Sequence, residues 1–487
     1  MKRREFLKTT AYGTASLIGS SLARGATEGD QDGPNILWIK AEDICPDLSC
    51  YGTAGVETPH LDRLAEQGAR YEDCYVTAPV CSPSRTAMML GMYPSTVGGL
   101  HHRTPNRGQN KLPEGIRPLT HHLRDAGYFT ALGCGHHRKK DLNFRTSNLF
   151  DGNDWSQRAE GQPFYGELTL PVTHRSFTRD EKNPIGMDEV KIPPYYPDHR
   201  ITRRDWANYL ESMQVMDRQV GEVLQRLEED GLAENTVVVF MGDHGRCMPR
   251  GKQFLYDGGV RVPLIIRWPG RIEPGTVSEE MISAIDVTAS VLQMATGEVP
   301  EHVHGRPFLE PSTPERDFIY AARGKMDRTH DSMRAVRSAD FKYILNLMPE
   351  RAWCQYNAYK ERSYPVLALL NVMYLEGRLN EEQERFMLPA KPREELYDLQ
   401  KDPHETRNVA CDSDYREDLM RMRQRMRQVR ERIGDQGPGE KFRQGGWPDT
   451  YPTHSLETWK KALQMWEEYL FGDGPGPDND LLSVPGG

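Results

Sequence analysis

Short apolar runs recur through the first two-thirds of the chain and predict buried β-strands. They lie at 35–40 (NILWIK), 128–133, 164–170, 236–241 (TVVVFM) and 262–268, and a further strand is expected at 70–76. Runs that are apolar at consecutive positions, rather than at every second one, are typical of strands covered on both faces. We therefore expect a sheet that is buried between other elements.

Helical patterns separate these runs. One helix is predicted to begin at Thr58-Pro59, with Thr58 as the N-cap, and to end at Gly68. Between 205 and 230, apolar residues recur three or four positions apart, which is one face of a long helix. Another helix is expected at 285–295. Strands that alternate with helices in this way predict an α/β fold with a mostly parallel sheet.

The pattern changes near residue 330. The segment 334–346 predicts two short strands with a turn at 339–340, and polar helical stretches are expected at 376–388 and 413–433. The Gly/Pro-rich C-terminus is typical of a loose tail. We therefore predict a main domain over 34–330, a smaller C-terminal domain with a minor antiparallel sheet over 331–472, and a flexible tail over 473–487.

The N-terminus has the parts of an export signal. A basic start with paired Arg3-Arg4 precedes a mildly apolar, small-residue stretch, and Ala23 offers a suitable cleavage site. Arg3-Arg4 followed by Phe-Leu-Lys resembles the bacterial twin-arginine signal. We predict a signal peptide over 1–26, export by the twin-arginine machinery, and a periplasmic or secreted protein. The alternative is an amphipathic N-terminal segment without a targeting role.

Composition and charge exclude several classes of protein. The 487 residues are 37% hydrophobic and 27% charged, which is ordinary for a globular chain. No apolar run approaches the roughly 18 residues that a membrane span needs. A net charge of −9 argues against a generic nucleic-acid binder, because no overall basic field would neutralise phosphates. Eight cysteines are too few for a disulfide scaffold in so long a chain.

Chemically active side chains follow five of the predicted strands. In open α/β sheets, ligands bind beyond the carboxyl ends of the strands, where such side chains converge. Taken singly, each of these positions could be a solvated turn. Together they predict one site, whose members are Glu42 and Asp43, Cys81 and Arg85, His136 and His137, His174 and Arg175, and Asp243 and His244.

The segment 81–85 (CSPSR) is the most specific local motif. Pro83 suits the first helical position with Ser82 as the N-cap, and Gly91 ends the expected helix. Cys81 would then lie at a helix N-terminus, where backbone N–H groups favour an anion. The alternative is a buried structural cysteine.

This motif resembles the maturation motif of the formylglycine-dependent sulfatases, whose fold is alkaline-phosphatase-like. That fold is a sandwich with a large mixed, mostly parallel sheet between helices and a smaller C-terminal domain. The segments 241–245 (MGDHG), 251–263 (GKQFLYDGGVRVP) and 395–410 are also similar. The chain looks most like the heparan N-sulfatases (sulfamidases), because His174-Arg175 and the step from Asp243 to Lys252 fall in register. The resemblance implies hydrolysis of an N-sulfate of glucosamine in heparin- or heparan-type glycans.

The resemblance also implies roles for individual residues. Cys81 would be oxidised by a formylglycine-generating enzyme to formylglycine (3-oxoalanine), whose hydrated diol attacks sulfur. Arg85 would hold the diol and Lys252 the sulfate oxygens, while His137 and His174 line the pocket and can protonate the leaving group. One divalent cation, normally calcium, would be held by Glu42, Asp43, Asp243 and His244.

Three positions depart from the family pattern. Glu42 stands where aspartate is usual, and it still offers a carboxylate. His244 stands where asparagine is common, which opens the site to zinc or manganese because nitrogen is a poor calcium ligand. Gly135 occupies the position of a lysine that normally grips sulfate, so either the substrate differs or the replacement is His136, Lys139 or Lys140.

The mouth of the site is expected to be basic. Residues 1–26 hold five basic and one acidic side chain, so their removal changes the net charge from −9 to −13. A polyanionic sugar then needs a local positive potential to approach. The residues assigned to this mouth and to substrate binding are His101, His102, Arg103, Arg107, His136, Arg138, Lys139, Lys140 and Arg175.

Other functions remain open from the sequence. An O-sulfatase for another sulfated polysaccharide would explain Gly135. A phosphodiesterase or phosphonate hydrolase would use the same superfamily and the same metal geometry. A sugar-binding protein without catalytic activity would leave Cys81 unmodified.

Overall fold

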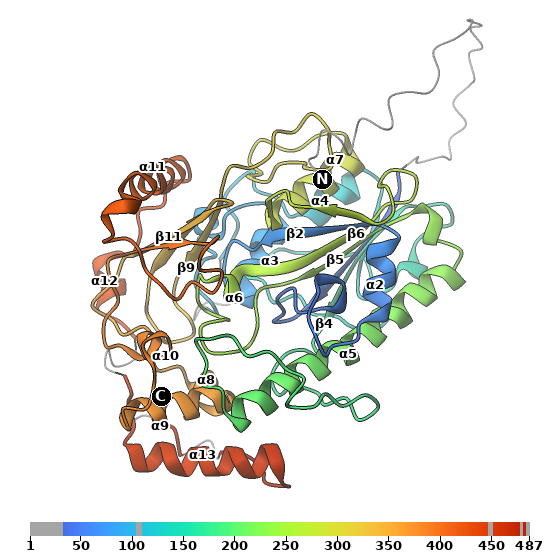
Figure 1. The fold of residues 1–487 in the computed structure, drawn as a ribbon. Coiled ribbons are helices and arrows are strands. Elements are labelled where there is room, and N and C mark those ends of the chain that lie inside the picture. Colours follow the sequence, from blue (N-terminus) through green and yellow to red (C-terminus); the bar gives the residue numbers. More distant parts are fainter. Residues whose placement is uncertain (1–32, 104–109, 447–450, 478–480, 484–487) are drawn as a thin grey trace, which may run out of the picture.

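The computed structural model describes residues 33–103, 110–446, 451–477 and 481–483 (Figure 1). The predicted signal peptide over 1–26 and Arg107 lie outside the described residues. Among the described residues, no helix combines the length and the apolar character that a membrane crossing requires.

A large sheet occupies the centre of the molecule. Within the described chain it has eight strands in the order β3-β4-β1-β5-β6-β2-β7, and β8 also pairs with β2. The strands are β1 (Asn35–Ala41), β2 (Ala69–Tyr75), β3 (Phe129–Leu132), β4 (Phe164–Leu170), β5 (Thr236–Gly242), β6 (Arg261–Arg267), β7 (Thr276–Ser278) and β8 (Ile282–Ser283).

All strands of this sheet except β6 point the same way, which places the carboxyl ends of β1 to β5 at one edge. β1, β3, β4 and β5 run parallel to one another, and β6 is antiparallel to both β5 and β2. β2 therefore points the same way as β5. Every residue of β1, β4 and β5 is buried, as their continuous apolar sequences predict. The mostly parallel sheet is confirmed.

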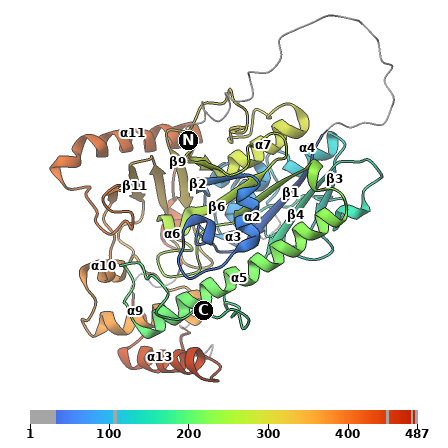
Figure 2. The ribbon, with the colours of Figure 1, turned by 45° about the vertical axis from the view of Figure 1, so that its right-hand side comes forward.

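Helices cover the sheet in two groups (Figures 1 and 2). α3, α4 and α7 pack against one another, and α2 packs against α5. Their bounds are α2 (Pro59–Glu66), α3 (Cys81–Leu90), α4 (Leu119–Asp125), α5 (Arg200–Glu229), α6 (Asp257–Val260) and α7 (Ala284–Thr296). Short 3-10 helices lie at η1 (Ser49–Tyr51), η2 (Pro94–Val97), η3 (Trp155–Gln157) and η4 (Ala233–Asn235).

One predicted helix start is confirmed, with Thr58 at the N-cap position of α2, and the other was wrong in detail. α2 begins at Pro59 as expected, but the Thr58 hydroxyl contacts Ser49 instead of capping the helix. α3 begins at Cys81 itself, with Val80 as the N-cap, so Pro83 is the third helical residue. Proline fits there because the first N–H groups of a helix have no intrahelical partner to lose.

A second, antiparallel sheet of four strands forms the smaller C-terminal part, as predicted. Its order is β12-β11-β10-β9, and α11 packs on β10 and β11. β9 precedes residue 331, so the small sheet takes a strand from the segment that we had assigned to the main domain. The bounds are β9 (Ile319–Arg323), β10 (Met333–Arg337), β11 (Phe341–Asn346), β12 (Glu394–Asp398) and α11 (Arg416–Arg432).

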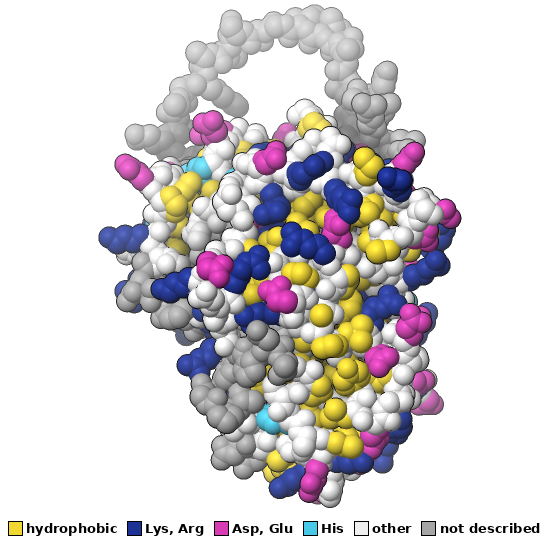
Figure 3. All heavy atoms as spheres, turned by 90° about the vertical axis from the view of Figure 1, so that its left-hand side faces the viewer, with side chains coloured by type: hydrophobic (Ala, Val, Ile, Leu, Met, Phe, Trp, Pro, Cys, Tyr) yellow, Lys and Arg dark blue, Asp and Glu magenta, His cyan; other side chains and the backbone are white. Residues whose placement is uncertain are grey.

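In the view of Figure 3, basic side chains gather on the upper half, where the Arg-rich α11 lies.

Further helices complete this part. The predicted helix over 376–388 is only α10 and a 3-10 turn, because Gly377 and the N-cap Asn380 interrupt it. The bounds are α8 (Ala358–Ser363), α9 (Pro365–Leu375), α10 (Glu381–Glu384), η5 (Arg385–Met387), η6 (Ser413–Tyr415), α12 (Glu440–Arg443) and α13 (Leu456–Phe471).

Part of the predicted flexible tail is packed. Leu482 is fully buried in a cluster with Ala368 of α9 and Trp459 of α13. The Tyr356 hydroxyl donates a hydrogen bond to the Leu482 carbonyl at 3.2 Å. Burial of this apolar side chain holds the segment in place, although the tail as a whole is rich in glycine and proline.

Candidate active site

The strand ends bring four buried ligand groups together. Asp43 follows β1, Cys81 begins α3 after β2, and Asp243 and His244 follow β5. One ligand atom from each of these residues lies within 4.8 Å of all the others. Carboxylate, imidazole and thiol groups at this spacing form a candidate metal-binding cluster.

Asp43 is the centre of the site. Its backbone N–H donates to Asp243 Oδ1 at 2.9 Å, and its own Oδ1 lies 2.9 Å from His244 Nε2. The Lys252 ammonium donates to both Asp43 oxygens, at 2.9 and 2.8 Å. Burial alone would raise the pKa of Asp43, but the charges of Lys252 and His244 outweigh it and hold the pKa well below its usual range.

Cys81 occupies the first turn of α3. Its side chain is buried, and Sγ lies 3.1 Å from His244 Nε2 and 4.0 Å from Asp43 Oδ1. The helix directs its unpaired N–H groups toward this end of the sheet, as predicted from the motif. The candidate nucleophile position and the candidate metal ligands therefore share one buried site.

Arg85 lies one helical turn after Cys81 and joins two of the carboxylates. Its Nη2 donates to Glu42 Oε1 and to Asp243 Oδ2, both at 2.9 Å, and Nε donates to Asp243 Oδ2 at 3.0 Å. Nη1 donates to Thr169 Oγ1 at 2.8 Å. A planar guanidinium suits this fork, so Arg85 fixes the positions of Glu42 and Asp243.

Lys139 supplies an ammonium group where Gly135 has none. Gly135 has φ +85°, a backbone conformation that favours glycine over lysine. The Lys139 ammonium forms an ion pair with Glu42 Oε1, and the Lys139 side chain is 35% exposed. Of the three replacements that the sequence left open, Lys139 is the one with an ion pair to the carboxylate cluster in the described structure.

Lys252 also contacts a second group of potential ligands. Its Nζ lies 2.8 Å from Asp43 Oδ2, 3.3 Å from His174 Nε2 and 3.9 Å from Cys247 Sγ. Asp43, His174 and Cys247 are close enough together to hold a metal ion. Asp43 belongs to both groups, and the Lys252 ammonium contacts both of its oxygens. The group that contains Cys81 is the one with two carboxylates, those of Asp43 and Asp243.

Sequence reasoning missed Cys247. Its thiol donates to Asp43 Oδ2 at 2.6 Å, and its Sγ lies 3.1 Å from the Tyr359 hydroxyl of α8. Burial raises the pKa of Cys247 to about 11, so it is a neutral thiol at pH 7. Its position three residues after His244 could have placed Cys247 near the site from the sequence. No feature of the sequence placed Tyr359 there.

His136 and His137 lie apart from this cluster. Their rings are in contact, tilted by 56° with centroids 4.1 Å apart, and His136 is exposed. In the described chain, no hydrogen bond or ion pair links either ring to Cys81. Burial, together with His136, lowers the pKa of His137 to about 4, so His137 is neutral at pH 7.

Arg175 does not reach the pocket, contrary to prediction. Its two Nη atoms each donate to an Asp205 carboxylate oxygen at 2.6 Å, and Nε donates to the Cys247 carbonyl at 2.9 Å. The side chain is 4% exposed. The Asp205 carboxylate binds the guanidinium, so the Arg175 side chain is not free to contact a substrate.

Loss of this pair should destabilise the protein. Because Arg175→Ala leaves the buried Asp205 charge without its partner, we expect the free energy of unfolding to fall by about 3–5 kcal/mol. Denaturant unfolding of the variant measures the change. The double variant Arg175→Ala/Asp205→Ala should recover part of the loss, and an unchanged unfolding midpoint for Arg175→Ala would contradict this role.

His101 and His102 are held by protein groups and do not form an open mouth, so this prediction was wrong. The His101 ring stacks on Phe442 and its Nδ1 accepts the Lys325 backbone N–H at 3.1 Å. His102 is 4% exposed, with Nδ1 3.2 Å from Asp327. Burial lowers the pKa of both rings, that of His101 to about 4.

Some of the basic residues assigned to the mouth do face solvent. Arg103, Arg138 and Lys140 are exposed, and Lys139 is partly exposed. Arg103, Lys139 and Lys140 line one pocket. The described part of the predicted basic mouth is therefore made by arginine and lysine rather than by histidine.

Comparisons with known proteins agree with this geometry. The sulfatase family matches residues 34–297, and the C-terminal region of N-sulphoglucosamine sulphohydrolase matches residues 242–363. An ulvan-active sulfatase of Formosa agariphila is 34% identical over 457 residues, which cover 82% of this chain and 75% of that protein.

Solved structures share the fold at lower identity. One protein, determined with its substrate D-glucosamine-2-N,6-O-disulfate, is 18% identical with a TM-score of 0.60, covering 84% of this chain and 100% of that one. A phosphonate monoester hydrolase from Silicibacter pomeroyi is 20% identical with a TM-score of 0.58, covering 83% and 96%. These likenesses show the fold alone. On the family match and the ulvan-active relative, the chain belongs to the sulfatase family and has its alkaline-phosphatase-like fold.

Proposed function

We propose that the protein hydrolyses sulfate esters of a sulfated polysaccharide outside the cytoplasm. In this proposal Cys81 is oxidised to formylglycine, and one calcium ion binds at Glu42, Asp43, Asp243 and His244. The observation that carries the proposal is the cluster of three buried carboxylates around Cys81, with Arg85, Lys139, Lys252 and His244 in contact with them.

The charges of this cluster suit an anionic substrate. Glu42, Asp43 and Asp243 are each at most 1% exposed. Arg85, Lys139 and Lys252 pair with them and carry three positive charges. Burial opposes a charge on His244, but the neighbouring carboxylates raise its pKa well above the usual value, so His244 must release its proton before it can bind a metal ion. A divalent cation would leave an excess of positive charge in a buried site, where electrostatic attraction to a sulfate group is strong.

The donor set fits a divalent cation. Carboxylates are the preferred ligands of calcium, and Asp43 and Asp243 converge with His244 within 4.8 Å. The Arg85 guanidinium holds Glu42 and Asp243 in place. A cation bound here would act as a Lewis acid on the sulfate oxygens. His244 leaves zinc and manganese as the alternatives that elemental analysis must exclude.

Protein side chains supply the remaining steps of the proposal. Formylglycine at position 81 would supply the nucleophilic oxygen. The Lys139 and Lys252 ammonium groups would donate hydrogen bonds to sulfate oxygens. His174 Nδ1–H donates to the Arg175 carbonyl at 2.7 Å, which leaves Nε2 on the side of Lys252, 3.3 Å from its Nζ. His174 in its protonated form would donate the proton to the leaving oxygen, while Lys252 stays an ammonium.

Replacement of Lys139 tests its role in sulfate binding. Lys139→Ala should lower kcat/KM by about 10²-fold on every sulfated substrate, including a small aryl sulfate, because a charged donor to the sulfate is lost. Lys139→Arg should retain part of the activity. Initial rates on an aryl sulfate and on an oligosaccharide measure both variants.

A remote lysine provides the control for Lys139. Lys461 is exposed on α13, and Lys461→Ala removes the same charge away from the site. Its kcat/KM should equal that of the wild type. If Lys139→Ala affects only the oligosaccharide, Lys139 binds the glycan chain and not the sulfate that is cleaved.

N-sulfated glucosamine is a second candidate substrate. The match of residues 242–363 to the C-terminal region of N-sulphoglucosamine sulphohydrolase supports it. The 34% identity to an ulvan-active sulfatase supports an O-sulfated polysaccharide instead. Turnover should be compared on N-sulfoglucosamine, O-sulfated oligosaccharides including ulvan fragments, and a phosphonate monoester. Preference for the phosphonate would overturn the proposal.

Maturation and export belong to the same proposal. The twin-arginine pattern at Arg3-Arg4 supports export, and the CSPSR motif supports oxidation by a formylglycine-generating enzyme. N-terminal sequencing of the secreted or periplasmic protein tests the cleavage. Peptide mass spectrometry of residue 81 tests the oxidation, and an unmodified cysteine in active protein would refute it.

A further inference from the structure

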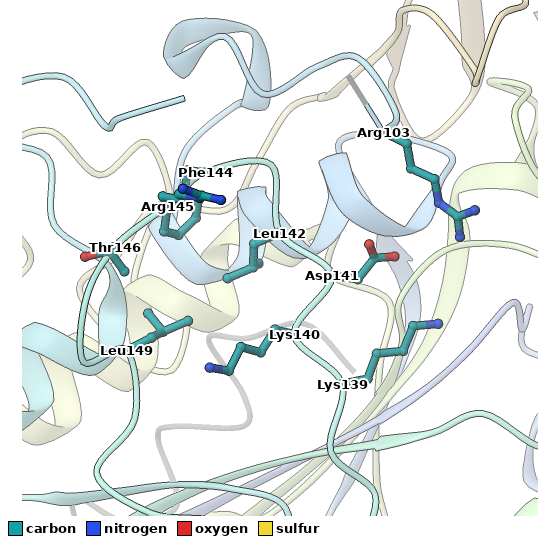
Figure 4. Close-up of a pocket in the computed structure, with 9 residues that line it drawn as sticks. All are labelled: Arg103, Lys139, Lys140, Asp141, Leu142, Phe144, Arg145, Thr146 and Leu149. Atoms are coloured by element: carbon teal, nitrogen blue, oxygen red, sulfur yellow. The ribbon is translucent and has the colours of Figure 1, made fainter. Parts of the chain in front are cut away.

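A separate pocket adjoins the candidate active site through Lys139 (Figure 4). Its volume is about 570 Å³, within the range of roughly 300–1,000 Å³ that is typical of ligand sites. Lys139 lines this pocket and forms an ion pair with Glu42 in the active site. A ligand in the pocket would therefore lie one side chain away from a group bound at Cys81.

The pocket is strongly basic. Arg103, Lys139, Lys140 and Arg145 line it, and Asp141 is the one acidic residue among its described lining residues. Arg103, Lys140 and Arg145 are exposed, so their charges are open to solvent. In a chain of net charge −9, such a local excess of cations attracts anions.

The side chains of Lys139 and Lys140 leave the backbone in opposite directions (Figure 4). Lys139 turns toward Glu42, whereas Lys140 extends toward the side of the pocket where Leu149 lies. Both lysines line the pocket, but the Lys139 ammonium reaches Glu42 of the active site and the Lys140 side chain does not turn that way. This difference allows their effects to be separated by substitution.

Apolar side chains form the other part of the pocket wall. Phe144 and Leu149 are 8% and 6% exposed, and Leu142 lies between them and Asp141 along the chain. Binding sites that join an apolar wall to a few polar groups suit ligands with both kinds of surface. A sugar ring with an anionic substituent has an apolar C–H face and a charged edge.

We propose that this pocket is a second subsite, which binds the anionic group of a sugar unit next to the one that loses its sulfate. The ligand is a carboxylate or a sulfate on the neighbouring unit, held by Lys140 and Arg145. This inference rests on the proposed function, because it requires a saccharide in the active site. It adds that the enzyme selects chains with anionic groups on adjacent units.

Substitution of Arg145 and Lys140 tests the subsite. The test compares one sulfated monosaccharide with three disaccharides whose second unit is neutral, carboxylated or sulfated. Arg145→Ala and Lys140→Ala/Arg145→Ala should raise KM about tenfold for the anionic disaccharides at low salt, and less at high salt. Their kcat should not change. KM for the monosaccharide and for the neutral disaccharide should equal the wild-type value.

The carboxylated and sulfated disaccharides identify the preferred anionic group. The group whose KM rises more in the variants is the one that the pocket prefers. The control is Arg427→Ala/Lys461→Ala, which removes two exposed cations from α11 and α13. An effect of the control equal to that of the pocket variant would show a general charge effect and overturn the subsite.

The remaining outcomes separate the two proposals. Equal KM changes for the monosaccharide and the anionic disaccharides would place Lys140 and Arg145 in the cleavage site and overturn the subsite. Wild-type KM values for every substrate would also overturn it. In both cases the proposed function stands, because sulfate is still released. If wild-type protein with formylglycine at residue 81 releases sulfate from none of the four saccharides, the proposed function itself fails.

Discussion

Cys81→Ala should abolish sulfate release, with a loss of at least about 10³-fold in kcat, because the proposed nucleophile is removed. The fold should persist. The Cys81 side chain is 2% exposed and small, and its contacts are to polar groups of the site rather than to an apolar cluster. Rates on an aryl sulfate and a thermal unfolding scan measure the two quantities.

Another buried cysteine supplies the control for this experiment. Cys74 lies in β2 with no exposed surface and packs in the main core. Cys74→Ala makes the same chemical change outside the site, so it should lower stability while activity per folded molecule is kept. Retention of more than about 1% of wild-type activity by Cys81→Ala would show that Cys81 is not the nucleophile.

Asp43→Asn should remove both the bound metal and the activity. Asparagine fits the backbone here, because Asp43 has φ +58° and asparagine tolerates that conformation. The neutral amide, however, is a weaker metal ligand and cannot balance Lys252. We expect less than stoichiometric calcium by elemental analysis and a kcat lowered by about 10³-fold. In chelated wild-type protein, added calcium should restore activity.

The loss of stability in Asp43→Asn must be separated from the loss of metal. Asp331 is a matched control, since it is fully buried and pairs with Lys391 and Arg323 of the smaller sheet region. Asp331→Asn should also be destabilised, by about 3–5 kcal/mol, but should keep its metal. Stoichiometric calcium in Asp43→Asn would refute the ligand assignment. Restoration of the chelated enzyme by zinc but not by calcium would refute the choice of metal.

The strand ends were predictable because their signal is local. An apolar run followed at once by Asp43 or Asp243 indicates a buried strand with a carboxylate at its end, and parallel strands bring such ends together. Contacts that depend on loop paths carried no comparable signal. The pairing of Lys139 with Glu42 and the contact of Tyr359 with Cys247 arise from packing between distant segments.

Local sequence also misassigned side chains whose partners lie elsewhere. Arg175 follows His174 directly, and adjacency suggested a shared role in the pocket. The buried carboxylate of Asp205 on α5 draws the guanidinium away from it. In the same way, a strand at 319–323 joins the small sheet through β10, although it lies before the change in sequence pattern.

The order of the strands in the sheet decides how long β1 waits for its neighbours during synthesis. β1 is made first, yet it lies between β4 and β5, and Asp43 meets Asp243 across 200 residues of sequence. At roughly 5–20 residues per second, Asp243 leaves the ribosome about 10–40 s after Asp43.

For that interval the apolar β1 lacks a neighbour along one edge, and Asp43 lacks its contacts with Asp243 and Lys252. Exposed strand edges of this kind can pair with other chains, so we expect the nascent protein to bind chaperones until β5 is made. Nascent chains stalled before residue 236 should therefore crosslink to a chaperone through β1. Chains that have left the ribosome as far as residue 267, the end of β6, should no longer form this crosslink.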